Sequence, residues 1–262
     1  MRSTISPAAL LLIAVAIAGC ANDPRLPPPY GPYVNRTARP YPDFHPPAVL
    51  GMRLIGLGTG FFIARDKVLT NFHVVRPCLA LTVGNNREGK EIMARYDYGD
   101  PQMDLAILTT EPADVTPARF EPVVGPETVQ DLSVVGYPAI GLPTYVAELD
   151  KVTAEAADIA KGERLFPFSG IVQEGNSGSP VLNNRAAVIG IVSAKLNPAR
   201  VFEETGMMVR DIGLAIPNNA VFAFLDKNDV PYLRADAKKP LVPTQVLSEA
   251  HGFVRQVGCW DR

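Results

Sequence analysis

Short apolar segments follow one another along most of the chain from about residue 50. Each contains β-branched or aromatic residues, and Gly, Pro, Asn or Asp separates it from the next. Strands that end in tight turns need such residues at the turns. The expected strands span 57–64, 68–71, 79–83, 104–110, 132–137, 144–153, 179–182, 186–195 and 207–216. Many short strands of this kind predict an all-β protein, either a β-sandwich or β-barrels.

Helical periodicity is limited to two segments. Residues 217–228 begin with Pro and Asn, as helices often do, and their apolar residues are compatible with one buried face formed by Val221, Phe222 and Leu225. A weaker helix is expected around 154–161. Little periodicity follows residue 230, so residues 231–262 are interpreted as a C-terminal extension of a domain that spans residues 49–230.

The N-terminus has a different pattern. One arginine, Arg2, precedes an uninterrupted run of apolar and small residues at 8–19. This run is too short to cross a bilayer, but it is typical of a signal peptide. The alternative is a buried helix of the mature fold, which the position at the very start of the chain disfavours. We therefore interpret residues 1–19 as a signal peptide.

The signal peptide ends in I-A-G-C, which resembles the lipobox of bacterial lipoproteins. The resemblance implies cleavage before Cys20 and acylation of that cysteine, so that the protein is anchored to a membrane. Ala21 follows the cysteine, which in such lipoproteins implies the outer membrane, facing the periplasm. An ordinary secretory signal that is cleaved nearby is the alternative.

Residues 20–48 are rich in proline and show no apolar period. Such sequences form semi-extended, partly polyproline II tethers, which suits the spacing of a folded domain from a lipid anchor. A docking site for a proline-binding partner is the alternative. His45 is interpreted as a solvent-exposed residue of this tether.

Composition and charge narrow the classes of function. Hydrophobic residues make up 47% of the 262 residues, enough for a sizeable core. The net charge is −2, the sequence pI is about 6.0, and no run of Lys and Arg occurs. A nucleic-acid-binding domain needs a basic patch, so nucleic acid is not an expected partner. We predict no cofactor and no bound metal, and no oligomeric state follows from the sequence.

Two cysteines remain besides Cys20. Cys78 and Cys259 form an even pair in a chain that is expected to reach an oxidising compartment, which favours a disulfide between them. Two separate buried thiols are the alternative.

A His, an Asp and a Ser are the candidate catalytic residues. His73 ends an apolar strand, and histidine is the usual base for acyl transfer near neutral pH. Asp104 opens an apolar strand, where a carboxylate is costly unless it is paired with a donor such as an imidazole N–H. Ser177 lies in E-G-N-S-G-S-P, a segment that by itself is compatible with an ordinary turn. The chain order His, Asp, Ser is that of the chymotrypsin fold.

The motifs G-T-G-F-F-I-A, V-L-T-N-F-H-V-V, D-L-A-I-L, G-N-S-G-S-P and I-G-L-A-I-P together resemble the trypsin-like serine peptidases of the HtrA (Deg) type, over about residues 50–226. The resemblance implies two six-stranded antiparallel β-barrels with a C-terminal helix. It also implies that Ser177 is the nucleophile, His73 the general base and Asp104 its orienting carboxylate. The backbone N–H groups of Gly175 and Ser177 match the oxyanion hole.

Three departures or details qualify the resemblance. Asn176 replaces the Asp that precedes the serine in digestive relatives, so activation by a freed N-terminus is not expected. The residues after 230 are too few for the PDZ domain that often follows in this family. The family's specificity pocket corresponds to Ile171, Val172, Ser193, Ala194 and Lys195. Because Ile171 is uncharged, we expect a preference for small or medium apolar side chains rather than Arg or Lys.

The sequence thus predicts an envelope-anchored serine endopeptidase that acts on protein or peptide substrates through an acyl-enzyme. One alternative is a catalytically silent trypsin-fold lipoprotein that binds proteins. Another is an esterase that uses the same three residues.

Overall fold

The computed structural model of the protein describes residues 47–84, 91–121, 129–138, 147–155, 164–236 and 239–262. The expected signal peptide, Cys20 and nearly all of the expected tether lie outside the described residues, as does most of the weak helix expected at 154–161. Residues 154 and 155 belong to a strand instead. A short 3₁₀ turn, η1 (Pro47–Val49), opens the described part of the chain.

The first barrel closes in the order β1-β14-β3-β4-β5-β2. All of its strand pairs are antiparallel. Its strands are β1 (Arg53–Phe62), β2 (Lys67–Thr70), β3 (Ala80–Gly84), β4 (Glu91–Asp100), β5 (Leu105–Thr110) and β14 (Val254–Asp261). A single-turn helix, α2 (Phe72–Val75), lies between β2 and β3.

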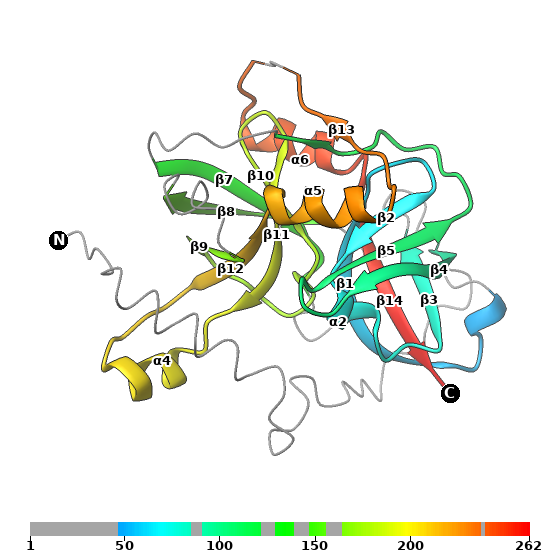
Figure 1. Cartoon of the computed structure of the whole chain (residues 1–262), viewed down its shortest axis with the longest axis horizontal. Helices are drawn as coiled ribbons and strands as arrows, with labels where there is room; N and C mark the ends of the chain where they lie inside the picture. The colour runs from blue at the N-terminus through cyan, green and yellow to red at the C-terminus, as the bar shows by residue number, and fades with distance from the viewer. Residues whose placement is uncertain (1–46, 85–90, 122–128, 139–146, 156–163, 237–238) are drawn as a thin grey trace.

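The last strand of the chain is an integral part of this first barrel. β14 lies between β1 and β3, where Figure 1 shows it in red running through the barrel. A disulfide joins Cys78 to Cys259 of β14, and Trp260 Nε1 donates a hydrogen bond to Thr82 Oγ1 at 2.8 Å. The expected boundary at residue 230 therefore does not separate this strand from the fold. Without β14, β1 and β3 would be open edges whose backbone groups need partners.

The second barrel closes in the order β10-β7-β8-β9-β12-β11, because β11 also pairs with β10. Its strands are β7 (Val129–Gly136), β8 (Glu148–Glu155), β9 (Phe166–Ser169), β10 (Pro180–Leu182), β11 (Val188–Lys195) and β12 (Ile212–Pro217). Two short strands, β6 (Arg119–Phe120) and β13 (Leu233–Arg234), continue from β11 in parallel. The prediction of two six-stranded antiparallel barrels is confirmed.

Strand β12 begins later than the sequence predicts. The expected strand starts at residue 207, but Asp211 has a left-handed backbone with φ 52°, which interrupts an extended chain. The helix α4 (Pro198–Thr205) precedes it and is missed by the sequence analysis. Asn197 Oδ1 caps this helix by accepting bonds from Ala199 N and Arg200 N, and Gly206 ends it with φ 70°.

The predicted helix at 217–228 is present as α5 (Asn218–Lys227), and a further helix, α6 (Pro243–Ala250), precedes β14. The apolar face of α5 differs from the expectation in one position. Val221 and Leu225 are buried together with Phe224, whereas Phe222 stacks on Tyr232 with ring centroids 4.8 Å apart. The 100° rotation per residue places Phe224 on the face of Val221 and turns Phe222 aside.

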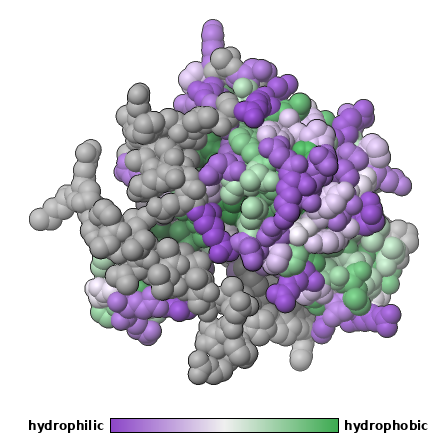
Figure 2. Space-filling view, in the orientation of Figure 1, coloured by the Kyte–Doolittle hydropathy of each residue, from purple (hydrophilic) through white to green (hydrophobic). Residues whose placement is uncertain are grey.

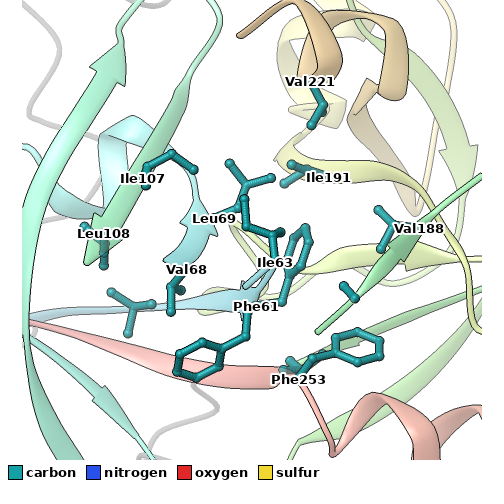
Figure 3. Close-up of a cluster of buried hydrophobic side chains, with 14 of the residues drawn as sticks. Phe61, Ile63, Val68, Leu69, Ile107, Leu108, Val188, Ile191, Val221 and Phe253 are labelled. Atoms are coloured by element: carbon teal, nitrogen blue, oxygen red, sulfur yellow. The ribbon is translucent and has the colours of Figure 1, made fainter. Parts of the chain in front are cut away.

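One hydrophobic cluster joins the two barrels. It contains Phe61, Leu69 and Ile107 of the first barrel and Val188 and Ile191 of the second. Figure 3 shows these side chains pointing toward one another, with Val221 of α5 above them. The interface between the barrels is therefore part of the core, so the barrels hold a fixed position relative to each other.

Candidate active site

His73 and Asp104 form a close pair on the first barrel. His73 lies in α2, and Asp104 immediately precedes β5. His73 Nδ1 lies 2.9 Å from Asp104 Oδ2 and 3.0 Å from Asp104 Oδ1, and the His73 backbone N–H donates to Oδ1 at 3.0 Å. Because the carboxylate accepts, Nδ1 carries the proton and Nε2 is the basic nitrogen of the neutral ring.

Several contacts fix the position of Asp104. Its backbone has φ 55°, a left-handed conformation that few non-glycine residues adopt. Its carbonyl oxygen accepts from Asn71 Nδ2 at 2.9 Å and from Phe72 N at 3.2 Å. Ser193 Oγ, on β11 of the second barrel, donates to Asp104 Oδ2 at 2.7 Å. The carboxylate is thus held from both barrels.

Ser177 lies in a turn that leads into β10. Two glycines with positive φ flank it, Gly175 at 89° and Gly178 at 86°, conformations that a side chain would strain. The Ser177 carbonyl accepts from Thr59 N at 2.8 Å, and Gly178 N donates to Val192 O at 2.9 Å. The turn is therefore attached to β1 of the first barrel and to β11 of its own.

Two contacts place Ser177 in the neighbourhood of the His–Asp pair. A Cβ atom on Gly58 would lie 3.3 Å from Ser177 O and 2.6 Å from Cγ1 of Val74, the residue after His73 in α2. Val192, which accepts the bond from Gly178, precedes Ser193, which reaches Asp104. The turn that contains Ser177 thus lies at the junction of the barrels, beside the residue that follows His73 and the strand that contacts Asp104.

The expected oxyanion-hole residue Gly175 is buried. Its carbonyl oxygen accepts from Thr59 Oγ1 at 2.7 Å. Asn176 is also buried, and its backbone N–H donates to Gln173 O at 3.1 Å, which closes the turn before the serine.

The five residues expected to line a specificity pocket occupy different positions. Ile171 is 56% exposed, whereas Val172 packs against the core of the second barrel. Ser193 bonds to Asp104, while Ala194 and Lys195 pair with β12 at the end of β11. The structure therefore gives Ser193 a contact with the His–Asp pair that the sequence analysis does not anticipate.

Two further residues at the site are missed by the sequence analysis, Asn71 and Thr59. Both are fully buried polar residues, and both donate to carbonyl groups of the candidate catalytic segments. A buried polar residue must be hydrogen-bonded, but the sequence does not reveal to what. Asn71 lies in the motif T-N-F-H and Thr59 in the motif G-T-G-F, and this position inside the family motifs is the feature of the sequence that could have indicated a role at the site.

Within the described residues, no group of three or more His, Cys, Asp and Glu side chains is arranged to hold a metal ion. None of the helices in the described part of the chain is long and apolar enough to span a bilayer.

Comparison with known proteins identifies the fold and the family. The crystal structure of the inactive form of the Rv3671c protease of Mycobacterium tuberculosis superimposes with a TM-score of 0.52 at 24% identity, over 69% of this chain and 92% of that one. At that identity the likeness shows the fold alone.

Two relatives in sequence match most of this chain, but the match covers only part of their own length. The protein y4bJ of Sinorhizobium fredii is 29% identical over 208 residues, which is 77% of this chain and 32% of that protein. The periplasmic pH-dependent serine endoprotease DegQ of Escherichia coli is 29% identical over 172 residues, 63% of this chain and 35% of that protein. The chain spans about a third of the length of these relatives.

A family model covers the residues that carry the site. The model described as a trypsin-like peptidase domain matches residues 58–191, just over half of the chain. That range begins at the glycine beside Thr59 and includes His73, Asp104 and Ser177. The chain therefore belongs to the family of trypsin-like peptidase domains.

Proposed function

We propose that the protein is a serine endopeptidase that cleaves protein substrates with Ser177 as nucleophile, His73 as general base and Asp104 as the carboxylate that orients the imidazole. The observation that carries this proposal is the contact of His73 Nδ1 with both oxygens of Asp104, at 2.9 and 3.0 Å. It fixes the tautomer in which Nε2 can accept a proton.

The reaction follows the acyl-enzyme route. Ser177 Oγ attacks the carbonyl carbon of the scissile bond while His73 Nε2 takes the hydroxyl proton. The N–H groups of Gly175 and Ser177 donate to the oxyanion of the tetrahedral intermediate. His73 then gives its proton to the leaving amine, and water attacks the acyl-enzyme in a second, analogous cycle.

Asp104 stabilises the imidazolium that forms in each cycle. The Asp104 side chain is only 20% exposed to solvent. Its carboxylate accepts hydrogen bonds from Ser193 Oγ and from His73 N. The attraction between two opposite charges is stronger at such a partly buried site than in bulk water, because the effective dielectric constant is lower. The carboxylate does not itself need to become protonated.

Apolar peptide segments are the substrates that we expect, because Ile171, at the position of the family's specificity pocket, is uncharged and exposed. Ile171 precedes the nucleophile turn and is exposed, and Phe202 and Met208 are 51% and 72% exposed on or just after α4. In the space-filling view, apolar surface lies beside strongly hydrophilic surface over this helix (Figure 2). Large exposed apolar side chains on a folded domain are candidates for contacts with such segments.

We further propose that the enzyme works in the bacterial envelope on a lipid anchor at Cys20. The name of its relative DegQ includes the word periplasmic, and the disulfide between Cys78 and Cys259 suits an oxidising compartment. Mass spectrometry of the native protein tests the anchor. We expect an acylated cysteine at position 20, whereas an unmodified N-terminus beyond residue 20 contradicts the proposal.

Covalent labelling tests the catalytic proposal. We expect a fluorophosphonate probe to label the chain produced from Ala21 onward, and to label neither Ser177→Ala nor His73→Ala. Ser248→Ala, on the exposed face of α6, is the matched control and keeps full labelling. An unlabelled wild-type chain, also in the presence of unfolded casein, would support a protein-binding module instead.

A further inference from the structure

Thr59 occupies an unusual position between the two barrels. It lies in β1 of the first barrel, it is completely buried, and it has a glycine on each side. Its three polar groups all face the segments that carry the candidate active site. A buried hydroxyl without partners would destabilise the fold, so its contacts account for its presence there.

Thr59 holds the nucleophile turn on both sides of Ser177. Its backbone N–H donates to Ser177 O at 2.8 Å, and its hydroxyl donates to Gly175 O at 2.7 Å. The hydroxyl oxygen in turn accepts from Tyr137 N, at the end of β7, at 3.0 Å. One residue of the first barrel thereby fixes two carbonyl groups of a turn that belongs to the second.

The contacts of Thr59 leave little room for adjustment. A Cβ atom on Gly178 would overlap the Thr59 carbonyl oxygen, which already accepts from Thr70 Oγ1 at 2.7 Å. A Cβ atom on Gly136 would lie 3.1 Å from Thr59 Oγ1. The turn is thus packed directly against this threonine, and a change in its hydrogen bonds must move the turn.

We propose that the Thr59 hydroxyl is a positioning group for the oxyanion hole, an inference that rests on the serine peptidase function proposed above. The Gly175 carbonyl belongs to the turn whose N–H groups, at Gly175 and Ser177, must point at the oxyanion. The two carbonyls belong to the peptide planes on either side of the plane that carries the Ser177 N–H, and the Gly175 carbonyl also lies in the plane next to the one that carries the Gly175 N–H. Holding both carbonyls therefore restricts the direction of the N–H groups between and beside them. Without the hydroxyl the turn retains Ser177 but loses the alignment that stabilises the transition state.

The test compares variants that differ only in the hydroxyl. Thr59→Val keeps the shape and removes the hydrogen bonds, and we expect kcat to fall roughly 10- to 100-fold with KM little changed, as for a small misplacement of catalytic groups. Thr59→Ser restores the hydroxyl and is expected to recover most of kcat. A peptide boronate that occupies the oxyanion hole should lose affinity for Thr59→Val in parallel with kcat/KM.

Thr82→Val is the matched control. Thr82 is equally buried in the same barrel, and its hydroxyl accepts from Trp260 Nε1, away from the nucleophile turn. We expect both valine variants to lower the melting temperature, but only Thr59→Val to lower kcat of the folded enzyme. Equal kcat in Thr59→Val and wild type, or an equal fall in both valine variants, overturns the inference.

Further variants and the wild-type activity separate a failure to fold, a failure of the proposed function and a failure of the positioning role. If Thr59→Val does not fold, Thr59→Ala and Thr59→Ser repeat the comparison, because both lose the methyl group and only one keeps the hydroxyl. If the wild-type chain neither hydrolyses peptides nor reacts with the fluorophosphonate probe, the proposed function itself fails. An active wild type with a fully active Thr59→Ala contradicts the positioning role alone.

Discussion

The two barrels contribute to the site in different ways. The first barrel supplies the His73–Asp104 pair, and its last strand is covalently tied to the residues just after α2 by the disulfide. Its buried threonines at 59, 70 and 82 all make hydrogen bonds. Its polar groups therefore stabilise the frame that holds the base.

The second barrel supplies Ser177 in a turn with less local support. Among the described residues, three buried side-chain atoms in and just after the turn, Asn176 Oδ1, Asn176 Nδ2 and Ser179 Oγ, have no hydrogen-bond partner. On the neighbouring β8, burial raises the pKa of Asp150, and the Glu148 carboxylate raises it further. The nucleophile turn is thus bonded to β11 of its own barrel and to Thr59 of the other, so its position depends on both barrels.

The largest effect should come from removing one charge on the first barrel. Asp104→Asn keeps a side chain that tolerates the left-handed backbone at φ 55°, but it no longer fixes the imidazole tautomer. We expect kcat to fall roughly 10⁴-fold with the fold intact. Steady-state peptide hydrolysis and circular dichroism measure the two parts. Asp114→Asn, an exposed carboxylate, is the control, and equal activity of the two variants would contradict the role of Asp104.

The disulfide should provide the next largest effect, and it acts on stability. Loss of such a bridge typically costs about 2–5 kcal/mol. We expect the double variant Cys78→Ser, Cys259→Ser to unfold at a lower urea concentration than wild type. Adding a reductant should lower the midpoint of the wild-type protein only. If the wild type does not respond to the reductant, β14 is held by its strand pairing alone.

Adding a methyl group beside the nucleophile turn, in Gly136→Ala, should destabilise the second barrel and displace the turn. A Cβ atom in Gly136→Ala would overlap Ser179 Oγ and lie 3.1 Å from Asn176 Oδ1. Such overpacking typically costs about 1–3 kcal/mol, and here it should also displace the turn and lower kcat. Gly56→Ala is the control in the first barrel, because its nearest contact would be Cys259 Cβ at an ordinary 3.6 Å. Equal unfolding midpoints and activities would show that the turn has room to move.

The smallest expected effects are on the pH dependence of stability, which should differ in sign between a carboxylate of the first barrel and one of the second. A hydrogen bond from Lys67 lowers the pKa of Asp97 in the first barrel from its ordinary value, so the ionised carboxylate stabilises the fold near neutral pH and this effect is lost in acid. The raised pKa of Asp150 has the opposite sign, because stability is lost as pH rises through it.

Urea unfolding between acid and neutral pH measures both carboxylates. At neutral pH we expect Asp97→Asn to lower the free energy of unfolding and Asp150→Asn to raise it. Both differences should shrink as the wild-type carboxylates become protonated. Two variants that shift stability in the same direction at neutral pH would contradict the contrast between the barrels.

The local pattern of the sequence predicted most of the strands and the order of the catalytic residues. Strands β1 and β11 are runs of apolar and small residues bounded by turn signals, so their positions follow from local chemistry. β4 and β9 were missed, since β4 is largely polar and β9 contains a proline. The five motifs in a fixed order indicated the family that the comparisons show.

Other features depended on contacts between distant residues. The place of β14 between β1 and β3 depends on which strand edges remain open after the other five have paired. The bond of Ser193 to Asp104 spans 89 residues, and that of Thr59 to Gly175 spans 116. No periodicity or composition encodes a partner at such a distance.

The sequence by itself thus determined which residue types are available for acyl transfer and in what order they occur. Only the tertiary structure decided how His73 and Asp104 meet, which strand completes the first barrel, and that Thr59 supports the nucleophile turn. The physical reason is that turn chemistry and strand patterns are local properties of the chain. Hydrogen bonds between barrels exist only after the shared hydrophobic core has fixed their relative position.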